Sequence, residues 1–329
     1  MISNADLSTQ NMGNTGIESC GINLEKIVGV ILMPDTLTFN AAAIATDAAL
    51  ITALQTAVLA AKTARAFPIL KAGAIVGVTD NTAEPTMDNA EYGDLMGVFY
   101  QKHSFTLRLG NNGMYLSQQL YKYMGNRNIA CAFIDAKGKV LFKKSGTGAK
   151  GIPCQVIADQ YKFATGAAAG IQNFRIILND TDALMDNDKL LVYPFANTVE
   201  LSDLIHGIHD VQLSAGTSTN TASALYVKAM LPASYVDFGL TFKTEIEAAD
   251  GNAFNVYDIT APTTPITVSG VTVDAAGQII IASAAAFTAG HSFYVSLKTP
   301  SELAGLTSAI GAATTGGYES NVLTVAVPS

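Results

Sequence analysis

Short apolar segments recur along most of the chain, and Gly, Asn, Pro and Thr separate them. Segments of this kind, rich in β-branched and aromatic residues and bounded by turn residues, are typical of β-strands. The series is densest after residue 208, where neither Cys nor Trp accompanies it. It predicts an immunoglobulin-like β-sandwich for 209–329. The expected strands there are 211–213, 224–231, 238–246, 253–259, 266–273, 278–284, 293–299 and 321–327.

The composition limits the classes of protein to which the chain can belong. Of its 329 residues, 49% are apolar and 14% are charged, which argues against a disordered chain. The length allows about two domains. The net charge of −8 and the sequence pI of about 4.9 disfavour a basic groove that follows a nucleic-acid backbone.

The sequence contains no recognisable targeting or membrane segment. Residues 1–22 are polar, and we expect an extended arm without a signal peptide. The most apolar run, 41–61, carries Asp47 and Gln55 among many Ala residues, unlike a membrane-spanning helix. It predicts an amphipathic helix over 40–65. The apolar stripe of this helix consists of Ile44, Ile51, Leu54 and Val58.

Between residues 24 and 208, strand patterns alternate with a few helices. The expected strands are 24–33, 69–79, 98–109, 152–163, 171–178 and 190–200, and 128–143 forms a hairpin around Asp135–Gly138. Further helices are expected at 114–124, closed by Gly125, and at 201–207. The first of these would bury Leu116, Leu120 and Met124. The polar, acidic stretch 80–97 is expected to be a long functional loop.

The cysteines and the glycine motif point away from redox or nucleotide chemistry. Cys20, Cys131 and Cys154 are odd in number and lack CxxC spacing, so we expect reduced, buried thiols in a protein made in the cytoplasm. The GxGxxG match at 146–151 precedes a strand pattern instead of a helix. It therefore predicts a hairpin loop, because a dinucleotide site needs a helix N-terminus after the glycines.

Two clusters resemble metal sites only in part. His206 and His209 would share one helix face, but no third His or Cys ligand lies nearby in the sequence. An acidic run lacks the Gly of a calcium loop and is expected to be a solvated turn. This run contains Asp180, Asp182, Asp186 and Asp188. Neither His103 nor His291 has a nearby triad partner, so we expect no catalytic residue, no metal, no cofactor and no enzymatic activity.

Tyrosines on and after the helix 114–124 could form a platform for stacking nucleic-acid bases. They are Tyr115, Tyr121 and Tyr123. No basic groove accompanies them. Since Tyr121 and Tyr123 are two positions apart, one is expected in the core and the other at a partner subunit.

The order of elements over 69–200 resembles the tail-tube proteins of long-tailed bacteriophages, whose fold also recurs in type VI secretion tubes. In that family a strand runs into a short helix, here HSFTLRL and GMYLSQQLYKYMG. A hairpin follows, here NIACAFIDAKGKVLF, and then two strands, here PCQVIADQYKF and QNFRIIL. A long loop precedes these elements, as 80–97 does, and some members end in an immunoglobulin-like domain. The N-terminal arm and the helix 40–65 depart from the family.

The resemblance implies a mainly β fold with minor α content. An N-terminal arm and first strand would occupy 1–39, and a tail-tube-like β-sandwich or barrel flanked by helices would occupy 40–208. The immunoglobulin-like domain would follow in 209–329. The implied assembly is a virion tube of stacked hexameric rings, in which each subunit adds strands to a common β-barrel.

The resemblance also implies how this assembly meets its partners. DNA would pass the lumen, typically acidic in the family, without specific binding, and other virion proteins would be partners, with no role for a membrane. The long loop would contact the next ring, or, alternatively, would be an ordinary solvated loop. Its candidate contact residues are Asp80, Glu84, Asp88, Glu91, Tyr92 and Asp94.

Other functions stay open at this point. A phage head protein, either decoration or capsid, would bind capsid shells instead of forming tubes. A surface adhesion module would suit a Thr- and Ala-rich sandwich, although no signal peptide is visible. An enzyme with paired carboxylates, such as a carbohydrate-active one, would need a pair that the spacing does not single out.

Overall fold

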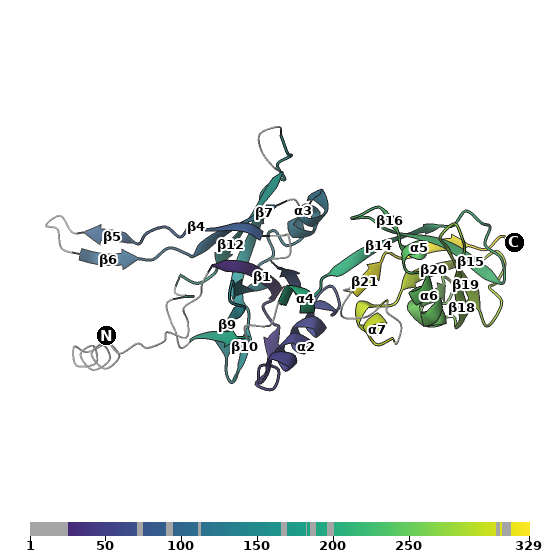
Figure 1. Cartoon of the computed structure of the whole chain (residues 1–329), viewed down its shortest axis with the longest axis horizontal. Coiled ribbons are helices and arrows are strands. Elements are labelled where there is room, and N and C mark those ends of the chain that lie inside the picture. Colours follow the sequence, from purple (N-terminus) through teal and green to yellow (C-terminus); the bar gives the residue numbers. More distant parts are fainter. Residues whose placement is uncertain are drawn as a thin grey trace.

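The computed structural model describes residues 26–70, 75–89, 95–110, 113–165, 170–181, 183–184, 189–195, 201–306, 310 and 317–329. Strands make up 45% of the chain and helices 16%, and the strands form several sheets, which confirms the prediction of a mainly β protein. Two groups of elements lie next to each other along the long axis of the molecule (Figure 1). We call them the N-terminal part, residues 26–205, and the C-terminal part, residues 208–329.

One large antiparallel sheet organises the N-terminal part. Its strands are β1 (Ile27–Pro34), β2 (Thr38–Phe39), β3 (Phe67–Ile69), β4 (Ile75–Asp80), β7 (Ser104–Gly110), β8 (Ile129–Asp135), β9 (Lys139–Ser145), β10 (Gly148–Lys150), β11 (Ile152–Ala158), β12 (Ile171–Leu178) and β13 (Leu190–Pro194). The order is β2-β10-β9-β8-β11-β12-β7-β4, with β1 also paired to β8 and β3, and β13 paired to β9.

This sheet curls around its own apolar side chains. Phe105 of β7 and Phe133 of β8 have ring centroids 5.2 Å apart, although β11 and β12 separate their strands in the sheet order. Leu107 and Phe174 belong to the same buried cluster as Phe133. In β7 and β12, every second residue is buried and the residues between them are more exposed, as expected of strands with one face on a core.

Strand β8 is buried along its whole length because both of its faces are covered. On its second face lies the helix α2 (Asp47–Val58), whose Leu50 and Leu54 pack with Ala132 and Phe142. The predicted helix 40–65 is therefore present but shorter. The side chain of Thr46 accepts a hydrogen bond from the Ala49 amide and so caps the helix at that point.

The other predicted helices of the N-terminal part are α3 (Gly113–Tyr121) and α4 (Leu201–Leu204). Leu120 is buried, but Met124 is 41% exposed, so the prediction that both share a buried face is wrong. The reason is that α3 ends at Tyr121, and Met124 follows in a turn that closes at Gly125 with φ of 75°. The hairpin of β8 and β9 around Asp135–Gly138 is confirmed.

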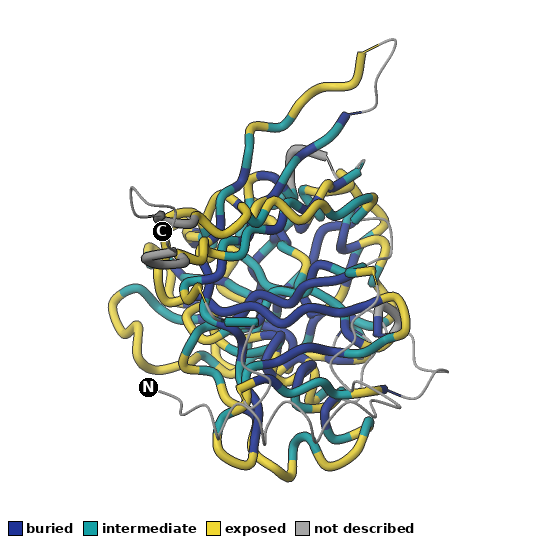
Figure 2. The backbone as a smooth tube through the Cα atoms, turned by 90° about the vertical axis from the view of Figure 1, so that its left-hand side faces the viewer, coloured by how far each residue is buried: buried dark blue, intermediate teal, exposed yellow. Residues whose placement is uncertain are grey.

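The C-terminal part has two sheets on either side of one apolar core. Their strands are β14 (Ile208–Ala215), β15 (Ala224–Leu231), β16 (Val236–Asp237), β17 (Phe254–Asp258), β18 (Val268–Val273), β19 (Gln278–Ser283), β20 (Ser292–Leu297), β21 (Gly317–Ser320) and β22 (Leu323–Ala326). The larger sheet has the order β18-β19-β15-β14-β21 with β16 beside β15, and the smaller has the order β17-β20-β22. Figure 2 views the molecule from the side of the N-terminal part, whose central strands are largely buried and whose surrounding turns are largely exposed.

The prediction that this part contains only strands and turns is wrong. The expected strand 238–246 forms the helices α5 (Phe238–Thr241) and α6 (Lys243–Ala249), and the 3-10 helix η2 (Asp250–Ala253) and the helix α7 (Pro300–Ala304) are also present. Asp237 caps α5 by accepting a hydrogen bond from the Leu240 amide at 2.9 Å. The two short helices bury Phe238 and Ile246 in the core, so tertiary packing overrides the strand-like pattern.

Candidate functional site

The predicted contact segment 80–97 leaves the large sheet at the end of β4. Asp80 and Glu84 are exposed at its beginning. Asp88 lies in a short strand, and its side chain is outside the described part of the structure. The remaining predicted contact residues, Glu91, Tyr92 and Asp94, lie outside the described residues.

The prediction that 80–97 is a loop without structure is wrong. It contains the strand β5 (Thr86–Asn89) and most of β6 (Leu95–Phe99), which pair antiparallel with Thr86 opposite Phe99. We call 86–99 the arm hairpin; it projects away from the large sheet beyond β4 (Figure 1). The polar residues of β5 hid this strand from sequence reasoning, whereas the apolar run at 95–99 was a usable signal.

The arm hairpin has little support from the rest of the subunit. Among the described strands, β5 and β6 pair only with each other. At its base, Phe99 is 59% exposed and Tyr100 is 49% exposed. A two-stranded hairpin without a third strand or a covering helix is marginally stable in water. A second molecule that covers the arm hairpin would therefore stabilise it.

The strand β4, which leads into the arm hairpin, has a second feature that another molecule could complete, namely its outer edge. β4 is the last strand in the order of the large sheet, and in the described part of the chain its outer edge has no partner. Val76 of β4 is 59% exposed. Unpaired backbone groups at such an edge can accept a strand from another chain.

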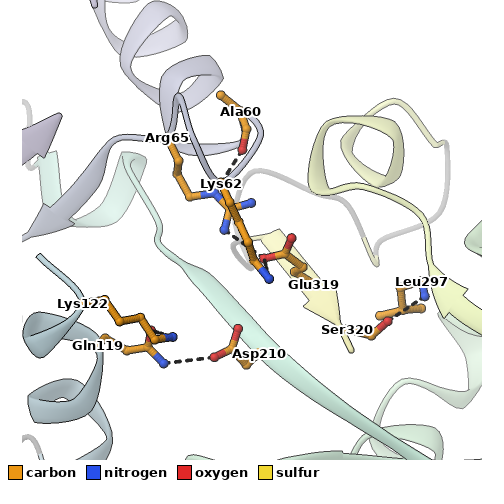
Figure 3. Close-up of polar contacts among 9 residues, drawn as sticks. All are labelled: Ala60, Lys62, Arg65, Gln119, Lys122, Asp210, Leu297, Glu319 and Ser320. Carbon is orange, nitrogen blue, oxygen red and sulfur yellow. Dashed lines mark hydrogen bonds and ion pairs between the residues drawn. The ribbon is translucent and has the colours of Figure 1, made fainter. Parts of the chain in front are cut away.

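A cleft of about 780 Å³ lies between the N-terminal and C-terminal parts. Arg65 crosses it, because its Nε donates to the Ala60 carbonyl at 3.0 Å and its Nη1 donates to Glu319 Oε2 at 3.0 Å (Figure 3). Lys62 Nζ lies 3.4 Å from the same carboxylate oxygen. Across the cleft, Gln119 Nε2 donates to Asp210 Oδ2 at 3.1 Å. Polar contacts therefore tie the two parts together.

This cleft offers polar groups for binding. The second terminal nitrogen of Arg65 is buried and has no hydrogen-bond partner among the described atoms. Burial raises the pKa of the nearby Tyr123, and the charge of Arg65 lowers it in part. In the ranges that the structure describes, no three His, Cys, Asp or Glu side chains gather as a metal site would require.

Two cysteines that are distant in sequence meet in the large sheet. Cys131 of β8 and Cys154 of β11 are free and buried, as predicted for those two, whereas Cys20 lies outside the described residues. Burial, together with a hydrogen bond to Cys154, raises the pKa of Cys131 well above its usual value. A thiol in this environment stays protonated and unreactive.

The GxGxxG match lies in the hairpin between β9 and β10, which confirms the predicted hairpin loop. Gly146 at its turn has φ of 58°, a conformation that favours glycine. The strand β11 follows it, so no helix N-terminus faces these glycines.

The histidines do not share a helix. His206 follows α4, whereas His209 lies in β14 with its ring 5.7 Å from that of Tyr318. Burial and the neighbouring His206 lower the pKa of His209. His103 Nδ1 lies 3.4 Å from the Thr82 hydroxyl, at the base of the segment that carries the arm.

One histidine pair was missed by sequence reasoning because its members are far apart in the chain. His291 Nδ1 lies 2.7 Å from Asp258 Oδ2. Hydrogen bonds from His291 and Thr260 lower the pKa of Asp258 from 3.8 to about 2. Of the acidic run, Asp180 lies 3.4 Å from Lys143 Nζ, and Asp182, Asp186 and Asp188 lie outside the described residues.

The tyrosines considered for a base-stacking platform lie in different environments. Tyr123 packs on Phe67 with ring centroids 5.3 Å apart, whereas Tyr121 is 39% exposed and donates its hydroxyl hydrogen to the Asp159 carbonyl. One of the two is thus packed and the other is at the surface. The side chain of Tyr115 is outside the described part.

None of the helices in the described ranges has the length and apolar character needed to cross a membrane. No protein-family model matches the chain, and no curated protein matches it in sequence.

Proposed function

We propose that this chain is a structural virion protein, the tail-tube subunit of a long-tailed bacteriophage, which assembles into stacked hexameric rings around a DNA conduit. One observation carries the proposal: the curled antiparallel sheet ends in strand β4, whose outer edge has no partner in the described part of the chain, and the chain continues from this strand into the projecting arm hairpin. An open edge and an unsupported hairpin are both features that neighbouring copies can complete.

The two features would serve two kinds of contact. Pairing β4 with a strand of the next subunit around a ring would continue the sheet and remove its open edge, as closure does in a β-barrel. The arm hairpin, together with Asp80 and Glu84 in the segment that leads into it, would reach an adjacent ring. Head-to-tail contacts of this kind close into rings when the rotation between copies allows it.

We also propose the division that the resemblance implies. In it, 40–208 is a tail-tube-like domain, and 209–329 is an immunoglobulin-like domain on the outside of the tube. The chain would be located in the virion and would act by assembly without turning over a substrate.

Electron microscopy of the purified protein at rising concentration tests this function. Rings or hollow tubes with a central pore are expected. A monomer at every concentration that binds capsid shells would overturn the proposal in favour of a head protein.

Removing the arm hairpin tests its assigned role. A variant in which a short Gly-Ser linker replaces 86–99 should still fold and form rings, but it should form no stacked tubes. The double variant Tyr235→Ser/Leu240→Ser is the matched control, because it removes exposed apolar side chains from the C-terminal part instead. Tubes of normal length from the arm variant would show that the arm has no role in stacking.

A further inference from the structure

The outer face of β4, β7 and β12 carries a concentration of positive charge. An open hollow of about 650 Å³ lies on this face, and its lining includes Arg108, Arg175 and Lys162 with a single carboxylate, Asp159. The chain as a whole has a net charge of −8, so this local excess of cations is opposite in sign to the rest of the protein.

The strand register explains why these side chains share one face. Arg108 lies opposite Asn173, and Arg175 lies opposite Thr106, so the two arginines occupy diagonal positions on neighbouring strands. Diagonal neighbours are about 7–8 Å apart. Lys162 joins the same face, because it forms a bridge with Ile171, two residues before Asn173.

These cations have no internal counter-ions. All three side chains are exposed, and none makes an ion pair or a side-chain hydrogen bond within the described residues. Gly77 lies opposite Arg108 on β4, so no side chain from that strand covers the guanidinium stem. The cations are therefore free to bind an external anion.

The other residues of the hollow indicate what kind of anion fits. Its described neutral lining consists of Thr, Ser and Asn side chains and Ile171, with no aromatic residue. Hydroxyl and amide groups hydrogen-bond to phosphate oxygens, and guanidinium groups bind phosphates through two donors. Single-stranded nucleic acids are usually held by stacking on aromatic rings, and the described lining of the hollow contains none.

We propose that this hollow contacts the phosphodiester backbone of duplex DNA through Arg108, Arg175 and Lys162, weakly and without regard to sequence. That the polyanion is DNA rests on the proposed function, whereas the positive charge of the hollow does not. The contact differs from the acidic wall that the resemblance implies, and it would give the passing DNA a charged surface to touch.

The test compares duplex binding by two variants with the same net charge. Arg108→Gln/Arg175→Gln neutralises the hollow, and Arg127→Gln/Lys144→Gln neutralises two exposed cations that do not line it. Fluorescence anisotropy with a labelled 20-base-pair duplex would measure affinity against salt. Three phosphate contacts predict about a 40-fold loss of affinity per chain between 50 and 200 mM salt, and one remaining contact predicts about a 3-fold to 4-fold loss.

We expect the wild type and the control variant to show the steep salt dependence and the hollow variant to show the shallow one. Arg108→Lys/Arg175→Lys should restore the steep dependence, because it keeps both charges. Equal effects of the hollow and control variants, or no duplex binding by the wild type at 50 mM salt, would overturn the proposal. Competition by inorganic phosphate as strong as by unlabelled duplex would identify a small-anion site and also overturn it.

Electron microscopy of the same samples separates this inference from the proposed function. Tubes without duplex binding would contradict the DNA contact alone. Duplex binding by a wild type that never forms rings would contradict the tube and keep the cationic hollow.

Discussion

The N-terminal and C-terminal parts bury their apolar side chains in different ways. In the C-terminal part, one cluster between two sheets holds buried side chains from Val211 to Val327. In the N-terminal part, two clusters lie on the two faces of a single sheet, with buried side chains from Val30 to Ile205. Each part therefore has its own core, and the contacts that join them include the ion pair of Arg65 with Glu319 and the packing of Ile208 of β14 against the N-terminal cluster.

The two parts also differ in what they leave uncovered. The C-terminal part packs α5, α6 and α7 against its core, whereas the N-terminal part carries a projecting hairpin and a polar outer face on β7 and β12. Under the proposed function, the arm hairpin, the outer edge of β4 and this polar face of the N-terminal part would contact other molecules.

The largest expected effects come from truncating the two cores separately. Phe142 and Phe238 are both fully buried, one in each part. Phe142→Ala and Phe238→Ala should each lower the free energy of unfolding by about 3–5 kcal/mol, because each leaves a cavity. If the cores are independent, scanning calorimetry should show two transitions, with each variant shifting a different one.

The two cores would not be independent if Phe142→Ala and Phe238→Ala each lowered the temperature of one shared transition by the same amount. Thr79→Ala is the control, because Thr79 is exposed on the polar face outside both cores, and its effect should stay within about 0.5 kcal/mol.

A smaller effect is expected where the two parts meet. The side chains of Arg65 and Glu319 are 13% and 21% exposed, so their ion pair is only partly screened by water. A double-mutant cycle with Arg65→Ala and Glu319→Ala should give a coupling of about 1 kcal/mol. A coupling indistinguishable from zero would mean that the polar bridge does not hold the two parts together.

The smallest effect concerns acid and belongs to the C-terminal part alone. The pKa of Asp258 is lowered from 3.8 to about 2, so the folded state favours its charged form. Its stabilising contribution is complete above the unfolded value and is lost as the pH falls toward about 2. His291→Ala should weaken the acid sensitivity of the C-terminal transition between these values and leave the N-terminal transition unchanged.

Calorimetry of the wild type and of His291→Ala between pH 3.8 and about pH 2 checks this prediction. An unchanged acid profile in His291→Ala would show that the hydrogen bond from His291 does not set the pKa of Asp258.

Local sequence patterns predicted correctly those elements whose local preferences are compatible with the tertiary packing around them. The β8–β9 hairpin is one case, because Asp135 Oδ1 accepts hydrogen bonds from the amides of Lys137 and Lys139, and Gly138 has φ of 80°. These preferences act within a few residues, so they can be read from the sequence. The segment 238–246 is the opposite case, because its apolar residues suit a strand or a helix, and packing against the C-terminal core decided for helices.

Of the two candidate surfaces, the sequence predicted only one in part, because the other depends on contacts between distant strands. The acidic stretch 80–97 stood out as a candidate contact segment, but its pairing into the arm hairpin did not, since β5 has few strand-forming residues. The cationic hollow was not predicted at all. Arg108, Arg175 and Lys162 are spread over 68 positions of a chain whose overall charge is negative, and only the pairing of distant strands brings them together.

The sequence alone determined that the protein is mainly β and where the hairpin turns at Asp135–Gly138 and at Gly146 lie. Each of these follows from side-chain periodicity or turn chemistry, which act over a few neighbouring residues. The tertiary structure decided the curl of the large sheet, the meeting of Cys131 with Cys154, the pair of Asp258 and His291, and the shared face of the cations. Those features depend on which distant strands become neighbours, and that choice is made by the packing of whole cores.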